Sequence, residues 1–201
     1  NVLTGFKFIG EQITFLEKKG EENRYIFGFE ESYGYLAGTY ARDKDAVVAS
    51  MLICEMTAYY KSKGMSLLDA LNAIYSEYGY YLHKQESFTF EGESGMQKMN
   101  EIMDNLRNNL PKQIGGFKVT VAADYLQQIS KNIAEGKEEK IDLPKSNVLS
   151  YSLENGSQVV LRPSGTEPKI KAYYSSCEPT KAECEAVLEI LKQDFKLILG
   201  V

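Results

Sequence analysis

Residues 148–174 have the sequence VLSYSLENGSQVVLRPSGTEPKIKAYY, and this stretch decides the fold that we expect for the second half of the chain. Short apolar runs rich in β-branched and aromatic residues alternate in it with turn-forming residues, which is typical of strands. We predict strands at Val148–Leu153, at Gln158–Arg162 and near Ile170–Tyr174. The dipeptide Asn155-Gly156 favours a tight hairpin between the first two strands, which should therefore pair antiparallel.

Helical periodicity surrounds these strands on both sides. Thr180 followed by Glu183, and Ser66 followed by Asp69, resemble capping boxes at helix starts. A basic turn and Gly20 mark the end of the first helix. We predict helices at Phe6–Lys19, Ala46–Tyr60, Ser66–Gly79 and Ser94–Leu110 and from Thr180 onward, and further strands at Arg24–Phe29, His83–Phe90 and Phe117–Val121.

Two α/β-type units follow from this order of elements. The natural break lies near Tyr81–Lys84, which predicts domains at residues 1–82 and 83–201. Within the first, the apolar strand at Arg24–Phe29 should be buried, and so should most faces of the helix at Ala46–Tyr60. In the second, the charged stretch Lys131–Lys145 lacks periodicity and should be a surface loop.

Composition excludes several classes of protein. The chain has 201 residues, 43% of them hydrophobic, and a net charge of −5, which argues against nonspecific binding to nucleic acid or to anionic membranes. No apolar run approaches the roughly 18 residues that a membrane-spanning helix needs. Three cysteines without a CxxC pair and a single histidine, His83, are too few soft ligands for zinc. A reducing cytoplasm is the simplest compartment.

The strongest candidate for chemistry is RPSGTEPKIK at residues 162–171, between two predicted strands. It offers a guanidinium, two hydroxyls, a glycine and lysines, which are the groups that bind phosphate. It is not a Walker loop, because the GxxxxGK spacing is absent. Two interpretations remain open, a phosphate cradle and a polar hairpin turn, since proline, serine, glycine and threonine are also common in turns.

A second candidate is GFEESYG at residues 28–34, where a predicted strand ends. Carboxylates there would accept hydrogen bonds from the hydroxyls of a polyol, although a solvated turn has the same composition. The charged run at residues 42–45, RDKD, follows closely; its members either pair with one another at a helix start or supply a cation to the same pocket. His83 flanks a strand among polar residues and is interpreted as a surface side chain rather than a base.

In combination, GFEES at 28–32 and RPSGTEPK at 162–169 resemble the α-D-phosphohexomutases, the family of phosphoglucomutases and phosphomannomutases. The resemblance implies a C-terminal fragment of such an enzyme, and its fold class is α/β plus α+β. Residues 1–82 would be a partial third α/β domain, with a mixed sheet and helices. Residues 83–201 would be a complete fourth α+β domain, with an antiparallel sheet and helices.

The resemblance also implies roles for individual residues. Sugar hydroxyls would be recognised by Glu30 and Ser32, with Lys44 as a nearby basic group, and Thr4-Gly5 resembles another loop on the substrate side. Phosphate would be bound by Arg162, Ser164, Gly165 and Thr166. Lys171 is added to these phosphate-binding residues because of its charge alone.

The implied function is that of an isomerase that interconverts hexose 1-phosphate and hexose 6-phosphate, with glucose 1,6-bisphosphate as intermediate and activator. The family's active phosphoserine loop and its DGDGDR-like Mg²⁺ loop are absent here, so we expect no catalytic residue, no metal ligand and no turnover from this fragment. Its partners would be the sugar phosphate and the missing N-terminal domains. Alternatives are a phosphomannomutase, a phosphopentomutase, a glucose-1,6-bisphosphate synthase or a noncatalytic sugar-phosphate-binding module.

Overall fold

A computed structural model describes residues 2–30, 33–92 and 94–200. The chain divides into two compact units, Asn1–Ala73 (unit 1) and Ile74–Val201 (unit 2). The division falls within a helix that spans Leu67–Tyr78. The domain boundary that we expect between residues 82 and 83 stays a prediction.

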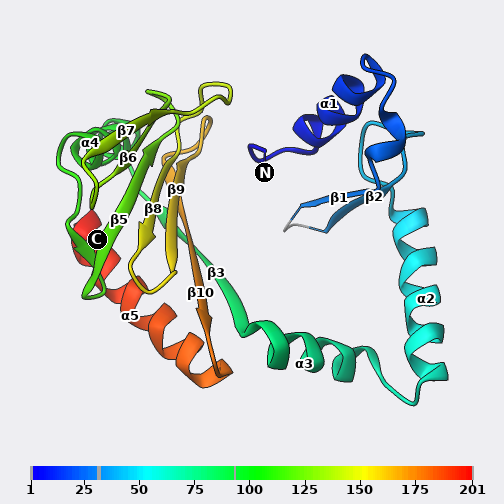
Figure 1. Cartoon of the computed structure of the whole chain (residues 1–201). Helices are drawn as coiled ribbons and strands as arrows, with labels where there is room; N and C mark the ends of the chain where they lie inside the picture. Colours follow the sequence, from blue (N-terminus) through cyan, green and yellow to red (C-terminus); the bar gives the residue numbers. More distant parts are fainter. Residues whose placement is uncertain (1, 31–32, 93, 201) are drawn as a thin grey trace. The chain divides into compact units, whose positions relative to one another are not determined.

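Unit 1 combines helices with a small antiparallel hairpin (Figure 1). Its core is formed by Phe6 and Ile13 from the first helix and Leu36 from the second strand, all buried. In the hairpin, Glu30 lies opposite Gly34 and Phe27 opposite Ala37. The elements are α1 (Phe6–Glu17), a 3-10 turn (Glu22–Arg24), β1 (Phe27–Glu30), β2 (Gly34–Ala37), α2 (Ala46–Ser62) and α3 (Leu67–Tyr78), which crosses into unit 2.

Two predictions of burial in unit 1 are wrong. β1 begins at Phe27 rather than at Arg24, and Phe29 in it is 65% exposed. No residue of α2 is buried in the described part of the chain, and Val47 is 81% exposed. The physical reason is the width of the sheet: a two-stranded hairpin has too little surface to cover a helix of 17 residues.

Unit 2 is built on an antiparallel sheet. Seven of its described strands follow the order β3-β10-β9-β8-β5-β6-β7, and the short β4 pairs with β5. Two helices complete the unit, α4 (Gly95–Asn108) and α5 (Lys181–Leu199). The strands are β3 (Tyr80–Thr89), β4 (Gln113–Ile114), β5 (Phe117–Asp124), β6 (Ile129–Asn132), β7 (Lys137–Lys140), β8 (Leu149–Leu153), β9 (Gln158–Pro163) and β10 (Lys169–Glu178).

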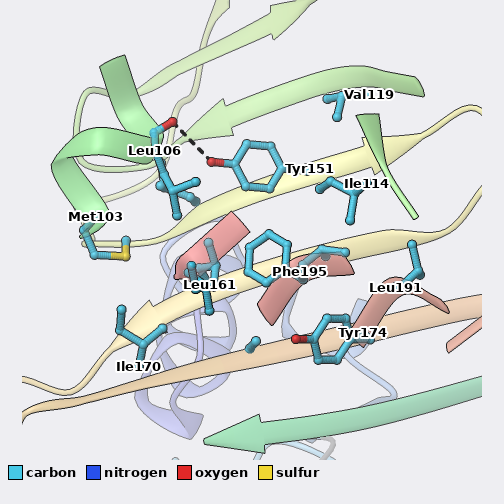
Figure 2. Packing of buried hydrophobic residues seen from close by; sticks show 14 of the residues in the cluster. Met103, Leu106, Ile114, Val119, Tyr151, Leu161, Ile170, Tyr174, Leu191 and Phe195 are labelled. Carbon is cyan, nitrogen blue, oxygen red and sulfur yellow. Dashed lines mark hydrogen bonds between the residues drawn. The ribbon is translucent and has the colours of Figure 1, made fainter. Parts of the chain in front are cut away.

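One face of this sheet packs against α4 and α5, and the core lies between the sheet and these two helices (Figure 2). Strand residues such as Leu161 and Tyr174 alternate into it, and helix residues such as Phe195 meet them. The rings of Tyr174 and Phe195 pack edge to face with centroids 6.1 Å apart. The buried Tyr151 hydroxyl donates a hydrogen bond of 3.4 Å to the Leu106 carbonyl, and burial raises the pKa of this tyrosine.

The guanidinium of Arg107 in α4 makes several hydrogen bonds within unit 2, and only 7% of this side chain is exposed. Its Nε donates to Asp124 of β5 at 3.1 Å, its Nη1 donates to Asp104 at 3.1 Å, and its Nη2 donates to Asn147. A buried arginine is stable only when its donors are paired, as they are here. The guanidinium therefore fixes α4 relative to the end of β5 and the segment before β8.

The sequence predicted the antiparallel sheet correctly but misplaced two parts of it. The stretch predicted as a loop at Lys131–Lys145 contains β7 and the end of β6, which pair with each other and carry ion pairs such as Lys131–Glu138 at 2.7 Å. Their charged sequence does not alternate as a half-buried strand does, because β7 is the exposed edge strand of the sheet and β6 beside it is only partly buried. β3 begins at Tyr80 rather than at His83, since β10 continues to Glu178 and supplies partners for three more residues.

The predicted turn and both predicted capping boxes are confirmed. Thr180 Oγ1 accepts from the Glu183 amide at 3.3 Å, and the Glu183 carboxylate accepts from the Thr180 amide at 3.0 Å. Ser66 and Asp69 make the same reciprocal pair. Gly156 in the β8–β9 hairpin has φ +81°, which only glycine adopts without strain.

We expect Leu191→Ala to lower the free energy of unfolding by about 2–5 kcal/mol, because it leaves a cavity in the core of unit 2. Leu197 lies on the same helix and is 78% exposed, so Leu197→Ala should change it by less than about 0.5 kcal/mol. Urea denaturation followed by circular dichroism measures both. Equal losses for the two variants would contradict the placement of α5.

Candidate phosphate and sugar sites

The candidate phosphate loop, residues 162–169, connects β9 to β10 in unit 2. Leu161, Ile170 and Ala172 are buried in the core beneath the helices. Successive side chains of a strand point to opposite faces, so Arg162 and Lys171 lie on the face that the helices leave open. The pairing of β9 with β10 also places these two residues directly opposite each other.

This juxtaposition of Arg162 and Lys171 is the most informative feature of the loop. Like charges directly opposite each other in a sheet are destabilising. Within residues 2–30, 33–92 and 94–200, no carboxylate forms an ion pair with either side chain. The neighbouring Lys169 differs, because its Nζ lies 3.0 Å from the Glu167 carboxylate. An unbalanced pair of cations beside an exposed loop is suited to an anion.

The backbone of the loop is closed by its own hydrogen bonds. The Ser164 amide donates to the Lys169 carbonyl at 2.8 Å. Ser164 Oγ accepts from the amides of Thr166 and Glu167, at 3.4 and 3.3 Å. These last two bonds are long for N–H···O, so a phosphate oxygen is a competitive acceptor for the same amides.

Gly165, at the tip of the loop, borders open space. A Cβ at this position would meet no atom within 4 Å, and its φ lies outside the left-handed region. Neither backbone conformation nor local packing therefore requires a glycine here. The structure brings the predicted residues Arg162, Ser164, Gly165, Thr166 and Lys171 together on one loop and its two strands.

In unit 1, Glu30 and Lys44 come together around Gly34. A Cβ at Gly34 would lie 2.8 Å from Glu30 Oε2, 3.2 Å from Lys44 Cδ and 3.3 Å from the Phe6 ring. Lys44 Nζ also lies 5.7 Å from the centroid of that ring. Sequence reasoning missed Gly34 as a site residue, although the second glycine of GFEESYG was the available signal. Ser32 lies outside the described residues.

The charged run at 42–45 forms local pairs with distinct roles. Lys44 Nζ is bonded to Asp43 Oδ1 at 3.0 Å; Asp43 raises the pKa of Lys44, and Glu30 adds to the rise. The same bond lowers the pKa of Asp43. Asp45 caps α2 by accepting from the Val47 amide at 2.8 Å, and Arg42 pairs with Glu17 of α1. Lys44 is therefore the cation of this run that faces Glu30.

A groove of about 430 Å³ extends from Glu30 along unit 1. Thr4 and Gly5 line it, and so do aromatic side chains of the hairpin, including Phe27. The two segments of unit 1 that the resemblance assigned to the substrate side thus border one groove. Its mixed polar and apolar lining is suited to a small polyol.

The described residues do not fit a Mg²⁺ site. The Asp43 carboxylate is engaged by Lys44, and the Asp45 carboxylate caps a helix and accepts from the Tyr40 hydroxyl at 2.6 Å. In the part of the chain that the structure describes, no three histidine, cysteine or acidic side chains converge. None of its helices is long and apolar enough to cross a bilayer.

The interpretation of His83 as a surface side chain is confirmed. It is exposed on β3, and its Nδ1 lies 2.8 Å from Ser175 Oγ on the neighbouring strand. Among the described residues it has no carboxylate partner that would make it a general base.

Comparisons with known proteins match both units. Residues 1–78 match the model of phosphoglucomutase/phosphomannomutase α/β/α domain III, and residues 97–192 match the model of the C-terminal domain of the same family. The chain belongs to the phosphoglucomutase/phosphomannomutase family. Residues 1–78 belong to the family's third domain and residues 97–192 to its C-terminal domain, which agrees with the α/β character of unit 1 and the antiparallel sheet of unit 2.

Relatives within the phosphoglucomutase/phosphomannomutase family include phosphoglucomutase from Staphylococcus haemolyticus, 44% identical over 175 residues. That alignment covers 87% of this chain and 31% of the relative. Phosphoglucomutase from Staphylococcus saprophyticus is 37% identical over 193 residues, which are 96% of this chain and 34% of that protein. The chain therefore spans about a third of the length of these relatives.

A solved structure supports the same fold. The open form of parafusin from Paramecium, an exocytosis-sensitive phosphoprotein described as a phosphoglucomutase, superposes with a TM-score of 0.61. The match covers 98% of this chain and 32% of that one, at 21% identity. At this identity the likeness concerns the fold alone.

We expect Lys171→Gln to raise the free energy of unfolding by about 0.2–1 kcal/mol, because it removes the repulsion from Arg162. The gain should be measured by urea denaturation at low ionic strength, and added salt should reduce it. Lys131→Gln is the control, since Lys131 is paired with Glu138 and should gain nothing. A Lys171→Gln protein no more stable than the parent would show that the two cations do not repel.

Proposed function

We propose that this chain supplies the sugar- and phosphate-recognition loops of a phosphoglucomutase-type isomerase. The observation that carries the proposal is the pair of Arg162 and Lys171, facing each other across β9 and β10 beside an exposed loop. The repulsion between two like charges lowers the free energy of unfolding, and an anion bound between them would offset this repulsion. Phosphate is the anion that fits this combination of groups.

The chemistry of the phosphate site follows from the geometry of each donor. The planar guanidinium of Arg162 can bind two phosphate oxygens at once, whereas Lys171 acts as a point charge. The hydroxyls of Ser164 and Thr166 lie on the same loop, and the side-chain-free Gly165 leaves room for the anion. Because these groups bind and orient a phosphate that does not react, they would act through positioning and charge stabilisation.

The sugar site would use the groove of unit 1. A carboxylate such as that of Glu30 accepts hydrogen bonds from two adjacent hydroxyls of a hexose, and Lys44 beside it can donate to a third oxygen. Glu30 also balances part of the charge on Lys44, so the pair can bind a neutral polyol without accumulating charge. Ser32 would add a hydroxyl from the same loop.

In the whole enzyme these loops would serve the interconversion of hexose 1-phosphate and hexose 6-phosphate. A bisphosphorylated intermediate, glucose 1,6-bisphosphate, would turn around between two phosphoryl transfers, while the phosphate loop would hold whichever phosphate is not reacting. The phosphoserine and the Mg²⁺ ligands would come from N-terminal domains outside this chain. This chain alone would therefore bind a sugar phosphate without turnover, and the enzyme would work in the cytoplasm.

For Arg162→Ala we expect the affinity of the chain for glucose 1,6-bisphosphate to fall about 10- to 100-fold, because a charge-assisted bidentate contact is lost. Isothermal titration calorimetry at low ionic strength measures this. Arg24→Ala is the matched control, since Arg24 is an exposed arginine of unit 1 paired with Glu21. A folded Arg162→Ala chain that binds as tightly as the parent would refute the phosphate assignment.

For Glu30→Gln in the full-length enzyme we expect kcat/KM for hexose phosphates to fall about 10- to 100-fold, because charged acceptors of the sugar hydroxyls are lost. Steady-state assays with glucose 1-phosphate, mannose 1-phosphate and ribose 1-phosphate also test which sugar is preferred. Glu11→Gln, on the exposed side of α1, is the control. Unchanged kinetics toward every sugar would remove Glu30 from the site.

A further inference from the structure

The far end of the phosphate loop is held by a residue beyond β3. The β3–β10 ladder pairs Thr89 with Lys169, and it continues for one more bond, in which the Phe90 amide donates to the Pro168 carbonyl at 2.8 Å. Phe90 is buried and belongs to the main core of unit 2. Pro168 is thereby tied to the core by its backbone.

Gly95, the first residue of α4, lies against the same two residues. A Cβ at Gly95 would lie 2.2 Å from the Phe90 carbonyl oxygen and 3.0 Å from Pro168 Cβ. The first distance is far below any normal contact and involves backbone, which cannot yield as a flexible side chain does. The φ of Gly95 is not in the left-handed region, so the need for glycine here is one of space and not of conformation.

We infer that Gly95 is a positioning residue for the phosphate loop: its missing side chain lets Phe90, and Pro168 which is bonded to it, lie against the start of α4. The inference rests on the proposed function, because it assigns Gly95 a part in phosphate recognition. Glu167 directly precedes Pro168, and the amides of Thr166 and Glu167 are the loop donors that reach Ser164 Oγ. A displaced Pro168 moves these amides relative to Arg162, which β9 fixes independently.

The neighbouring Gly92 provides a matched comparison within the same β3–α4 connection. It has φ +88°, and a Cβ there would meet no atom within 4 Å. Gly92→Ala therefore strains the backbone of the connection without touching Pro168. Gly95→Ala instead pushes on the backbone of Phe90, whose amide is bonded to Pro168, and on Pro168 itself. The two variants separate a general loss of stability from a displacement of the loop.

The test is calorimetric titration of the whole 201-residue chain with glucose 1,6-bisphosphate, alongside thermal unfolding without ligand. We expect Gly95→Ala to weaken binding about tenfold, as a displacement of binding groups does, and Gly92→Ala to bind like the parent. Binding by a folded Gly95→Ala chain that equals the parent would overturn the inference. Equal weakening in the two variants would overturn it as well.

Pro168→Gly tests the same contact from the side of the loop, and it decides the question if Gly95→Ala does not fold. It removes the ring that packs against Gly95, and it too should weaken binding about tenfold. Pro144→Gly is its control, since Pro144 is exposed between β7 and β8 and the change has the same effect on the unfolded chain. Unaltered binding in Pro168→Gly would overturn the inference.

A readout without ligand keeps this inference separate from the proposed function. In ¹H–¹⁵N spectra, Gly95→Ala should shift the amide signals of Thr166 and Glu167, while Gly92→Ala should leave them in place. If the parent chain binds no glucose 1,6-bisphosphate, the proposed function fails, and the spectra still decide whether Gly95 sets the loop. Unshifted Thr166 and Glu167 amides in folded Gly95→Ala would overturn the inference under either result.

Discussion

Strand β10 is the element on which the rest of unit 2 depends. It pairs antiparallel with β9 on one side and along ten residues with β3 on the other. Ile170, Ala172 and Tyr174 enter the core from it at every second position. Because one strand carries both a ladder on each edge and a row of core contacts, its position is determined several times over.

The candidate phosphate site is a consequence of this arrangement. Leu161, Ile170 and Ala172 are buried in the core. Because successive side chains of a strand point to opposite faces, Arg162 and Lys171 must lie on the open face. The antiparallel register then sets them opposite each other. The core therefore stabilises a placement of charges that would be unfavourable by itself. Such a conflict between local energy and global fold is expected where a protein binds a ligand.

The features that sequence could predict are those set by near neighbours in the chain. Thr180 with Glu183 and Ser66 with Asp69 form caps within one turn, and Asn155-Gly156 closes a hairpin between adjacent strands. The predictions that failed concern burial and edges. α2 is apolar on most faces yet exposed, and β7 is charged yet paired. In both cases the outcome depends on how wide a sheet is and which strand ends it.

The sites divide in the same way. The sequence by itself determined which chemical groups the candidate phosphate loop carries, since the guanidinium, hydroxyls and glycine of RPSGT lie within five consecutive residues. Only the tertiary structure decided that Lys171 faces Arg162, that Lys44 and Glu30 meet around Gly34, and that Gly95 contacts Pro168. The pairs Arg162–Lys171, Glu30–Lys44 and Gly95–Pro168 are 9, 14 and 73 positions apart in the sequence, and no local pattern specifies such neighbours. They exist because burying the core fixes the register of the strands, and the register then selects which side chains become neighbours.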